Sequence, residues 1–246
     1  MIFVYLDLLR IDVLAFLAVF GAIAMALIVG ISFHEFSHAF VADSLGDPTP
    51  RYAGRVSLNP LAHLDPAGTL LLFLVGFGWG KPVPVNGQLL RNGERVGMAM
   101  VAAAGPLSNF LVAALAGLPL KFGLIPWLPA FDPGAINQFI FRTGGPEEYL
   151  GLFLSTIVLV SIILGVFNLV PLFPLDGHRV VPAFLSPQAA RAYNQFQLRY
   201  GLLVLFILLV LPFVTGGRFG PLFAVMRPLI NLLARIFAGI DRDVFG

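Results

Sequence analysis

Long uncharged apolar stretches, separated by short polar connections, dominate the pattern of this chain. A transmembrane helix needs about 20 predominantly apolar residues. Four stretches reach or approach that length with no charge inside them, at residues 13–33, 96–120, 149–175 and 200–217. The pattern therefore predicts a helical protein that crosses a membrane about four times.

A fifth apolar stretch, residues 219–240, differs because it contains two arginines. Arg227, Asn231 and Arg235 are spaced four residues apart, which places them on one face of a helix. A polar stripe of this kind suits either an interfacial helix or a span packed against the bundle. The topology of this segment stays open.

A shorter apolar segment at residues 69–79 is about half the length of a transmembrane helix. Gly76, Gly78 and Gly80 weaken it as a helix, and Pro-containing turn signals flank it on both sides. Irregular backbone is tolerated at membrane depth only where protein or a water-filled cavity satisfies its polar groups. We expect a re-entrant or interfacial segment resembling a β-hairpin.

Composition supports the same fold class. Of the 246 residues, 58% are hydrophobic and 11% are charged, whereas soluble domains carry about 25% charged residues. The 15 Lys and Arg are scattered singly, so we expect no basic patch and no nucleic-acid partner. The prediction is an integral membrane protein of the all-α polytopic class, with about four to six transmembrane helices in a single domain over residues 1–246.

The placement of Lys and Arg predicts an orientation. Residues 43–95 hold five of them and residues 178–199 hold three, whereas residues 121–148 hold only Lys121 and Arg142. Cytoplasmic loops carry the excess of Lys and Arg. The first two connections are therefore expected in the cytoplasm, which requires that residues 69–79 do not cross the membrane.

Two acidic residues stand out because each lies at the end of a long apolar stretch, where an ionisable group is costly and indicates a functional site. They are Glu35 and Asp176. Glu35 lies inside the H-E-x-x-H motif His34–His38. On a helix the two histidines share a face and can bind one metal ion, with the glutamate beside it as general base. Zinc suits two His and one carboxylate. The alternative is a polar patch that caps the helix end.

A third metal ligand must come from elsewhere in the chain, and His63, Asp65 and Asp176 are the candidates. Asp176 follows Pro171 and Pro174 at the end of an apolar stretch. Prolines there free backbone polar groups, which favours a cavity over lipid contact. The alternative role for Asp176 is the N-cap of a following helix.

The two motifs together resemble the site-2 protease family of intramembrane zinc metalloproteases. The first is H-E-x-x-H at residues 34–38, and the second is N-x-x-P-x-x-P-L-D-G at residues 168–177. Residues 42–49, 54–63 and 80–86 further resemble its compact branch, which lacks a PDZ domain. The resemblance covers residues 33–180 and includes the small-residue motif at residues 104–109.

By this resemblance His34, His38 and Asp176 are zinc ligands and Glu35 is the general base. Asn168 matches a position that helps to hold the substrate or the developing oxyanion, although a helix–helix hydrogen bond explains it equally well. The resemblance also implies that the region 54–86 presents substrate as an added strand. Asn109 is interpreted as structural, within a close-packed helix contact.

Two further histidines need an interpretation. His178 stands where many members of the similar family have Gly or Ser. We expect its side chain to be exposed. The alternatives are that it contacts a metal ligand or that it binds the metal itself. His63 is read as a structural residue of its loop rather than a ligand.

The function implied is hydrolysis of peptide bonds within or near transmembrane segments of membrane-protein substrates. The alternative is a non-catalytic membrane metal-binding protein or metal-ion transporter, but transporters commonly show repeated halves and several intramembrane acids, and this sequence shows neither. A prokaryotic plasma membrane is expected, with the site opening towards the cytoplasm. The sequence carries no mark of the substrate or of the oligomeric state.

Overall fold

The computed structural model describes residues 8, 12–75, 80–131, 145–216 and 220–245. Two features of the sequence analysis lie outside these residues: the last part of the predicted hairpin, residues 76–79, and Arg142. Within the described part of the chain, five helices are long and apolar enough to cross a membrane. The prediction of an all-α polytopic membrane protein is confirmed.

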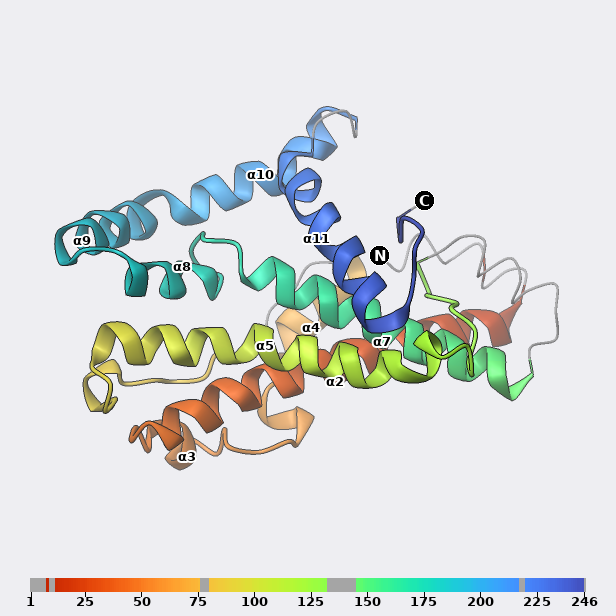
Figure 1. Ribbon diagram of the computed structural model, residues 1–246, viewed down its shortest axis with the longest axis horizontal. Helices are drawn as coiled ribbons and strands as arrows, with labels where there is room; N and C mark the ends of the chain where they lie inside the picture. The colour runs from red at the N-terminus through yellow and green to blue at the C-terminus, as the bar shows by residue number, and fades with distance from the viewer. Residues whose placement is uncertain (1–7, 9–11, 76–79, 132–144, 217–219, 246) are drawn as a thin grey trace.

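Three long helices form the centre of the molecule: α2 (Val13–Ser44), α5 (Glu94–Lys121) and α7 (Pro146–Asn168). They run side by side, and each packs against the other two (Figure 1). The start of α2 is fixed by Asp12, whose Oδ1 accepts hydrogen bonds from the backbone N–H groups of Leu14 and Ala15. Fully buried alanines let the helices approach closely, among them Ala22, Ala26, Ala39, Ala42 and Ala113.

The segment predicted to resemble a β-hairpin is different in the structure. Its first part belongs to helix α4 (Pro66–Val75), which starts where Asp65 Oδ1 accepts a hydrogen bond from Gly68 N. The only β-pairing among the described residues is an isolated antiparallel bridge between Leu64 and Gly80. The glycines at the end of this segment weaken a helix only there, and the leucine-rich run before them consists of good helix formers. The hairpin prediction is not confirmed, because a helix with one bridge at its base takes its place.

The C-terminal part consists of α9 (Pro187–Phe196), the π-helical turn η4 (Gln197–Gly201), α10 (Leu202–Val214) and α11 (Pro221–Ala238). The first three are continuous, and only 17% of the most apolar part of this span is buried, against 61% for α7. By contrast α11 packs against α5 and α7, crossing them obliquely (Figure 1). Its buried side chains recur every four residues, at Met226, Ile230, Ala234 and Ala238.

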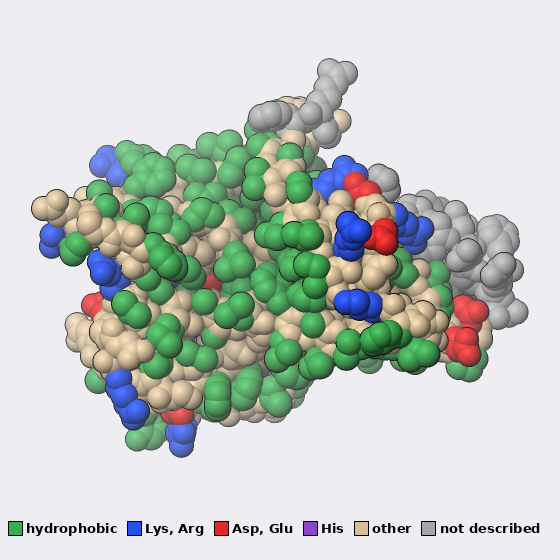
Figure 2. Space-filling model, viewed as in Figure 1, with side chains coloured by type: hydrophobic (Ala, Val, Ile, Leu, Met, Phe, Trp, Pro, Cys, Tyr) green, Lys and Arg blue, Asp and Glu red, His purple; other side chains and the backbone are tan. Residues whose placement is uncertain are grey.

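Short elements connect these helices: α3 (Thr49–Tyr52), η1 (Pro60–Ala62), η2 (Gly87–Leu89), α8 (Gly177–Val180) and η3 (Val181–Phe184). Figure 2 shows hydrophobic side chains over the middle of the molecule, with Lys and Arg gathered towards its two ends. This distribution suits a protein whose middle lies in hydrocarbon and whose ends lie in the headgroup regions.

Candidate metal centre

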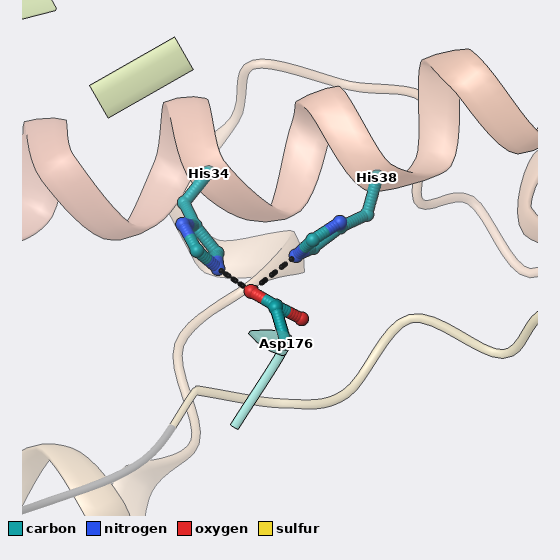
Figure 3. A group of neighbouring side chains, drawn as sticks. All are labelled: His34, His38 and Asp176. Atoms are coloured by element: carbon teal, nitrogen blue, oxygen red, sulfur yellow. Dashed lines mark ion pairs between the residues drawn. The ribbon is translucent and has the colours of Figure 1, made fainter. Parts of the chain in front are cut away.

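Two histidines from one helix meet an aspartate from a distant segment. His34 and His38 lie one turn apart on α2 and are both buried. The Nε2 atoms of the two rings lie 3.0 Å and 3.3 Å from Oδ2 of Asp176. Figure 3 shows both rings pointing from α2 at the single carboxylate. All three ligand atoms lie within 4.8 Å of one another, so they can hold one metal ion.

Asp176 reaches this position because α7 ends early. The predicted apolar stretch continues to residue 175, but the helix stops at Asn168, before Pro171 and Pro174. Asp176 occupies the N-cap position of α8, but its side chain caps no backbone N–H and faces the histidines instead. A Cβ on Gly177 would lie 2.3 Å from the carbonyl oxygen of Leu169, so the turn that presents the aspartate requires glycine here.

The proline-broken segment is also held from outside the three central helices. Gln197, at the start of η4 and only 3% exposed, accepts a hydrogen bond from Phe173 N and donates one to Pro171 O. The hydroxyl of Tyr193 donates to the same carbonyl. These bonds satisfy the polar groups that the prolines leave without helical partners.

Helix α5 orients the second histidine. Nδ1 of His38 lies 2.7 Å from the backbone carbonyl of Val101. A carbonyl can only accept, so Nδ1 carries a proton; in the neutral ring this leaves the lone pair of Nε2 facing Asp176. Holding the far nitrogen in this way is the usual arrangement for a metal-binding histidine. This contact could not be predicted, because a backbone acceptor has no side-chain signature in the sequence.

Gly105 provides the space for both rings. A Cβ at this position of α5 would lie 2.5 Å from Nε2 of His38 and 2.7 Å from Cε1 of His34. Any side chain would therefore push the imidazoles out of place. The motif around Gly105 was predicted only as a close helix contact; in the structure this contact makes room for the two imidazole rings.

Two polar residues fix the crossing of α2 and α5 beside the site. The hydroxyl of Ser108 lies 3.2 Å from Phe33 O and 2.7 Å from Gly105 O. With its amide turned so that the nitrogen donates, the fully buried Asn109 bonds to Gly30 O at 3.3 Å and Gly105 O at 3.2 Å. The carbonyl of Gly30 lies one turn before His34, so these bonds tie the helix that carries the histidines to the helix that accommodates them.

The donor set fits a zinc ion. Asp176 Oδ2 is buried and accepts no hydrogen bond, and the Nε2 atoms of His34 and His38 both face it. Such a group is costly without a positive charge between its members. Tetrahedral zinc, with bonds of about 2.0–2.2 Å, keeps its ligand atoms roughly 3.3 Å apart. The observed separations of 3.0 Å and 3.3 Å are close to that value.

A cavity of about 390 Å³ opens beside the three ligands. Glu35 lines it and is half-buried. Asn168 also lines it, and its Nδ2 donates to Leu164 O at 3.0 Å within its own helix. That bond runs along α7 and not between helices, and it leaves the other amide hydrogen of Asn168 free of a described partner.

Three candidates from the sequence lie outside the cluster. His63 is fully buried, with Nε2 donating to Ser57 O at 2.6 Å. Asp65 starts α4. His178 is half-buried and not exposed as predicted: its Nδ1 donates to Leu175 O at 2.6 Å, its ring lies edge-on to Phe173, and burial lowers its pKa.

The fold and this site together define a class: a polytopic membrane protein with a buried His, His, Asp metal cluster and a free carboxylate in the adjoining cavity. Comparison with known proteins specifies it further. The family model described as "Peptidase family M50" matches residues 134–212, which include Asn168 and Asp176. No solved structure matches the chain significantly.

Similar proteins are known in bacteria and archaea. YwhC of Bacillus subtilis (strain 168) is 34% identical over 215 residues, which are 87% of this chain and 92% of that protein. Rip2 of Mycobacterium tuberculosis (strain H37Rv) is 28% identical over 213 residues, 84% of this chain and 73% of that one. Both bear the name "Putative zinc metalloprotease". "Zinc metalloprotease MJ0392" of Methanocaldococcus jannaschii is 28% identical over 170 residues, 69% of this chain and 36% of that one.

The chain belongs to peptidase family M50, the site-2 protease family. It is therefore a metalloprotease with zinc as its cofactor, and it resides in a lipid bilayer. This confirms the resemblance drawn from the two sequence motifs and favours the hydrolase over the transporter alternative.

Proposed function

We propose that this protein is an intramembrane endopeptidase that hydrolyses peptide bonds within or near transmembrane segments of membrane-protein substrates. In this proposal His34, His38 and Asp176 hold the zinc ion, and residues 1–246 act as one membrane-embedded domain. The observation that carries it is the buried Asp176 oxygen, which faces two histidine nitrogens and accepts no hydrogen bond, next to a cavity that contains Glu35.

Zinc, when bound, polarises the scissile carbonyl and makes water a nucleophile near neutral pH. Glu35 is adjacent to His34 on α2 and lines the cavity, from where its carboxylate accepts the proton of the attacking water and passes it to the leaving amine. Asn168, on the wall formed by the end of α7, donates its free amide hydrogen to the substrate or to the developing oxyanion.

An extended segment supports presentation of the substrate as an added strand. Pro82, Val83 and Val85 line the cavity. The segment is anchored where Lys81 N donates to His63 O and where the Arg55 guanidinium donates to Lys81 O. Among the described residues, neither Val83 nor Val85 has a backbone hydrogen bond. Their N–H and C=O groups are available to an extended peptide, and backbone pairing gives affinity for many sequences.

We further infer a cytoplasmic orientation for the site and a prokaryotic plasma membrane as the location. The support is the excess of Lys and Arg in residues 43–95 and 178–199, which adjoin the metal ligands in the sequence, over residues 121–148. A helical substrate shields its own carbonyls, because they are hydrogen-bonded within the helix. We therefore expect helix-destabilising residues near the cut to promote cleavage, and equal cutting of stable and destabilised helices would contradict that.

The decisive experiment separates chemistry from metal binding. Detergent-purified Glu35→Gln is compared with wild type for zinc per chain and for cleavage of a single-span model substrate with a helix-breaking centre. We expect the zinc content to be kept and kcat to fall by about 10²- to 10⁴-fold. Glu147→Gln, an exposed acid at the start of α7, is the matched control and is expected to behave like wild type. Unchanged cleavage by Glu35→Gln would remove Glu35 as the base.

A further inference from the structure

A second cavity lies beside the metal centre. It measures about 670 Å³ and lies between the first turn of α5, the short helix α8 and the helix α9. Arg95, Arg179 and Arg191 line it, one from each of these elements. Figure 1 shows α8 and α9 at the same end of the molecule as the start of α5. Three arginines that are far apart in the sequence are therefore brought around one space.

This cavity has an excess of positive charge. Glu94 is its one acidic lining residue, against three guanidinium groups. The structure describes no ion pair for any of these arginines, and Arg95 makes one hydrogen bond, to Leu185 O at 3.1 Å. A guanidinium offers five donors in a planar fork that matches a carboxylate. The cavity is therefore complementary to an anionic group, and a carboxylate fits its donors.

Two connections join this cavity to the catalytic one. Arg179 lines both spaces. The extended segment that flanks the metal site also leads from one cavity to the other. Val85 lines the catalytic cavity. Two residues further on, a Cβ on Gly87 would lie 2.8 Å from Glu94 and 3.2 Å from Met98, which both line the second cavity. A strand advances about 3.3 Å per residue. A peptide laid along this segment would thus reach the arginines a few residues from its cleaved bond.

We propose that the cavity lined by Arg95, Arg179 and Arg191 selects substrates that carry Asp or Glu a few residues from the scissile bond. The proposal rests on the proposed function, which it deepens by naming a substrate class. A lipid headgroup would also supply negative charge, but the continuity with the catalytic cavity favours the substrate as the occupant.

The test uses three single-span model substrates whose helix-breaking residues lie near the cytoplasmic end of the span, and which differ only in the six residues that follow this end outside the hydrocarbon. These residues are Asp and Glu in the first substrate, Asn and Gln in the second, and Lys in the third. In phosphatidylcholine liposomes we expect kcat/KM to be about tenfold higher for the acidic substrate than for the amide one, because each exposed pair contributes up to about fivefold. The Lys substrate is expected to be cut most slowly. Added salt should weaken the preference.

The arginines are then tested directly. The double substitution Arg95→Gln and Arg191→Gln is expected to bring the acid-to-amide ratio close to one, with zinc per chain unchanged as the check on folding. Arg199→Gln is the control for the loss of one positive charge outside the cavity, since this arginine lies in η4 with its guanidinium 5.3 Å from the centre of the Tyr200 ring. We expect this control to keep the preference.

Three results would overturn the proposal. Equal cutting of the three substrates, with cleavage still dependent on Glu35, would reject it and leave the proposed function standing. A second result is that all three substrates are cut equally and that the cleavage rate of wild type, but not of the double variant, rises when phosphatidylglycerol is added. That result would assign the cavity to a lipid headgroup. No cutting of any substrate by the zinc-loaded wild type would reject the proposed function and this selection together.

Discussion

Two clusters of polar side chains lie on the helices of this protein, and they differ in charge balance. On α11, Arg227 forms an ion pair with Asp243, and Arg235 Nε lies 2.7 Å from Asp241 Oδ1. Between these pairs Asn231 Oδ1 accepts a hydrogen bond from the backbone of Val244. The residues that follow α11 thus fold back along its polar stripe and match each cation with an anion.

The cluster at the other site has no such balance. The Nε2 atoms of two histidines converge on one buried carboxylate oxygen, Asp176 Oδ2, which accepts no hydrogen bond in the described structure. Ionisable residues on an apolar helix therefore have two explanations, which are distinguished by their partners. A cluster that neutralises itself supports the fold, whereas one that leaves a charge unmatched indicates a bound ion.

The largest predicted effect comes from removing the unmatched carboxylate. Asp176→Ala should lower zinc affinity by more than about a hundredfold, since losing even a residue that supports a metal ligand costs ten- to a hundredfold. Zinc per chain in purified protein measures this. His63→Ala is the control, because His63 is buried near the cavity yet lies outside the cluster. If His63→Ala lost its zinc and Asp176→Ala kept it, the ligand assignment would be wrong.

A smaller effect is expected from crowding the rings. Gly105→Ala places a methyl group 2.5 Å from His38 Nε2, so we expect zinc affinity to fall by about ten- to a hundredfold. Gly21→Ala adds the same methyl group to α2, where its nearest neighbour is Phe153 at an ordinary 3.7 Å. That control should bind zinc like wild type. Equal affinities for both variants would show that the space at Gly105 does not position the histidines.

The polar contact between α2 and α5 should contribute less. Asn109→Ala removes the amide that faces Gly30 O and Gly105 O, and hydrogen bonds between membrane helices are worth about 1 kcal/mol. We expect a lower thermal midpoint in detergent and a modest loss of zinc affinity. Asn109→Gln, which keeps the amide, should restore part of both. A midpoint unchanged in Asn109→Ala would contradict the assigned contact.

The smallest effect is predicted for the self-neutralised cluster. Asp243→Asn breaks the ion pair with Arg227, so the thermal midpoint should drop slightly while zinc per chain stays constant. The hydrogen bond from Arg227 lowers the pKa of Asp243, so this contribution is present above the ordinary aspartate pKa and is lost as the pH falls through the lowered value. Thermal melts at pH 7 and under acidic conditions would check this, since the difference between variant and wild type should shrink in acid.

Much of the fold could be predicted because apolar length is a local property. The stretches 96–120 and 149–175 correspond to α5 and to α7 with its proline-broken extension. Helix α2 continues past residue 33 through the motif, which is why His34 and His38 share one face. The motif and Asp176 were identifiable because each combines ionisable residues with an apolar context.

Other features depend on tertiary contacts and could not be predicted. The cations are scattered singly along the sequence, yet the fold gathers Arg95, Arg179 and Arg191 around one cavity. Likewise the polar stripe alone could not decide the topology of α11. Its partners Asp241 and Asp243 lie in the residues after the helix and reach the stripe only because those residues fold back. Contacts between distant residues have no periodicity to reveal them.

The hydrogen bonds of Gln197 have a consequence for how this protein can be divided. All three residues of the metal cluster precede residue 177, so a shortened chain ending before α9 would contain every ligand. It would nevertheless lack the side chain that holds Pro171 and Phe173 in place. A shortened chain that keeps Asp176 in place must therefore extend at least through η4. Helix α10, in the least buried of the candidate spans, continues directly from this turn.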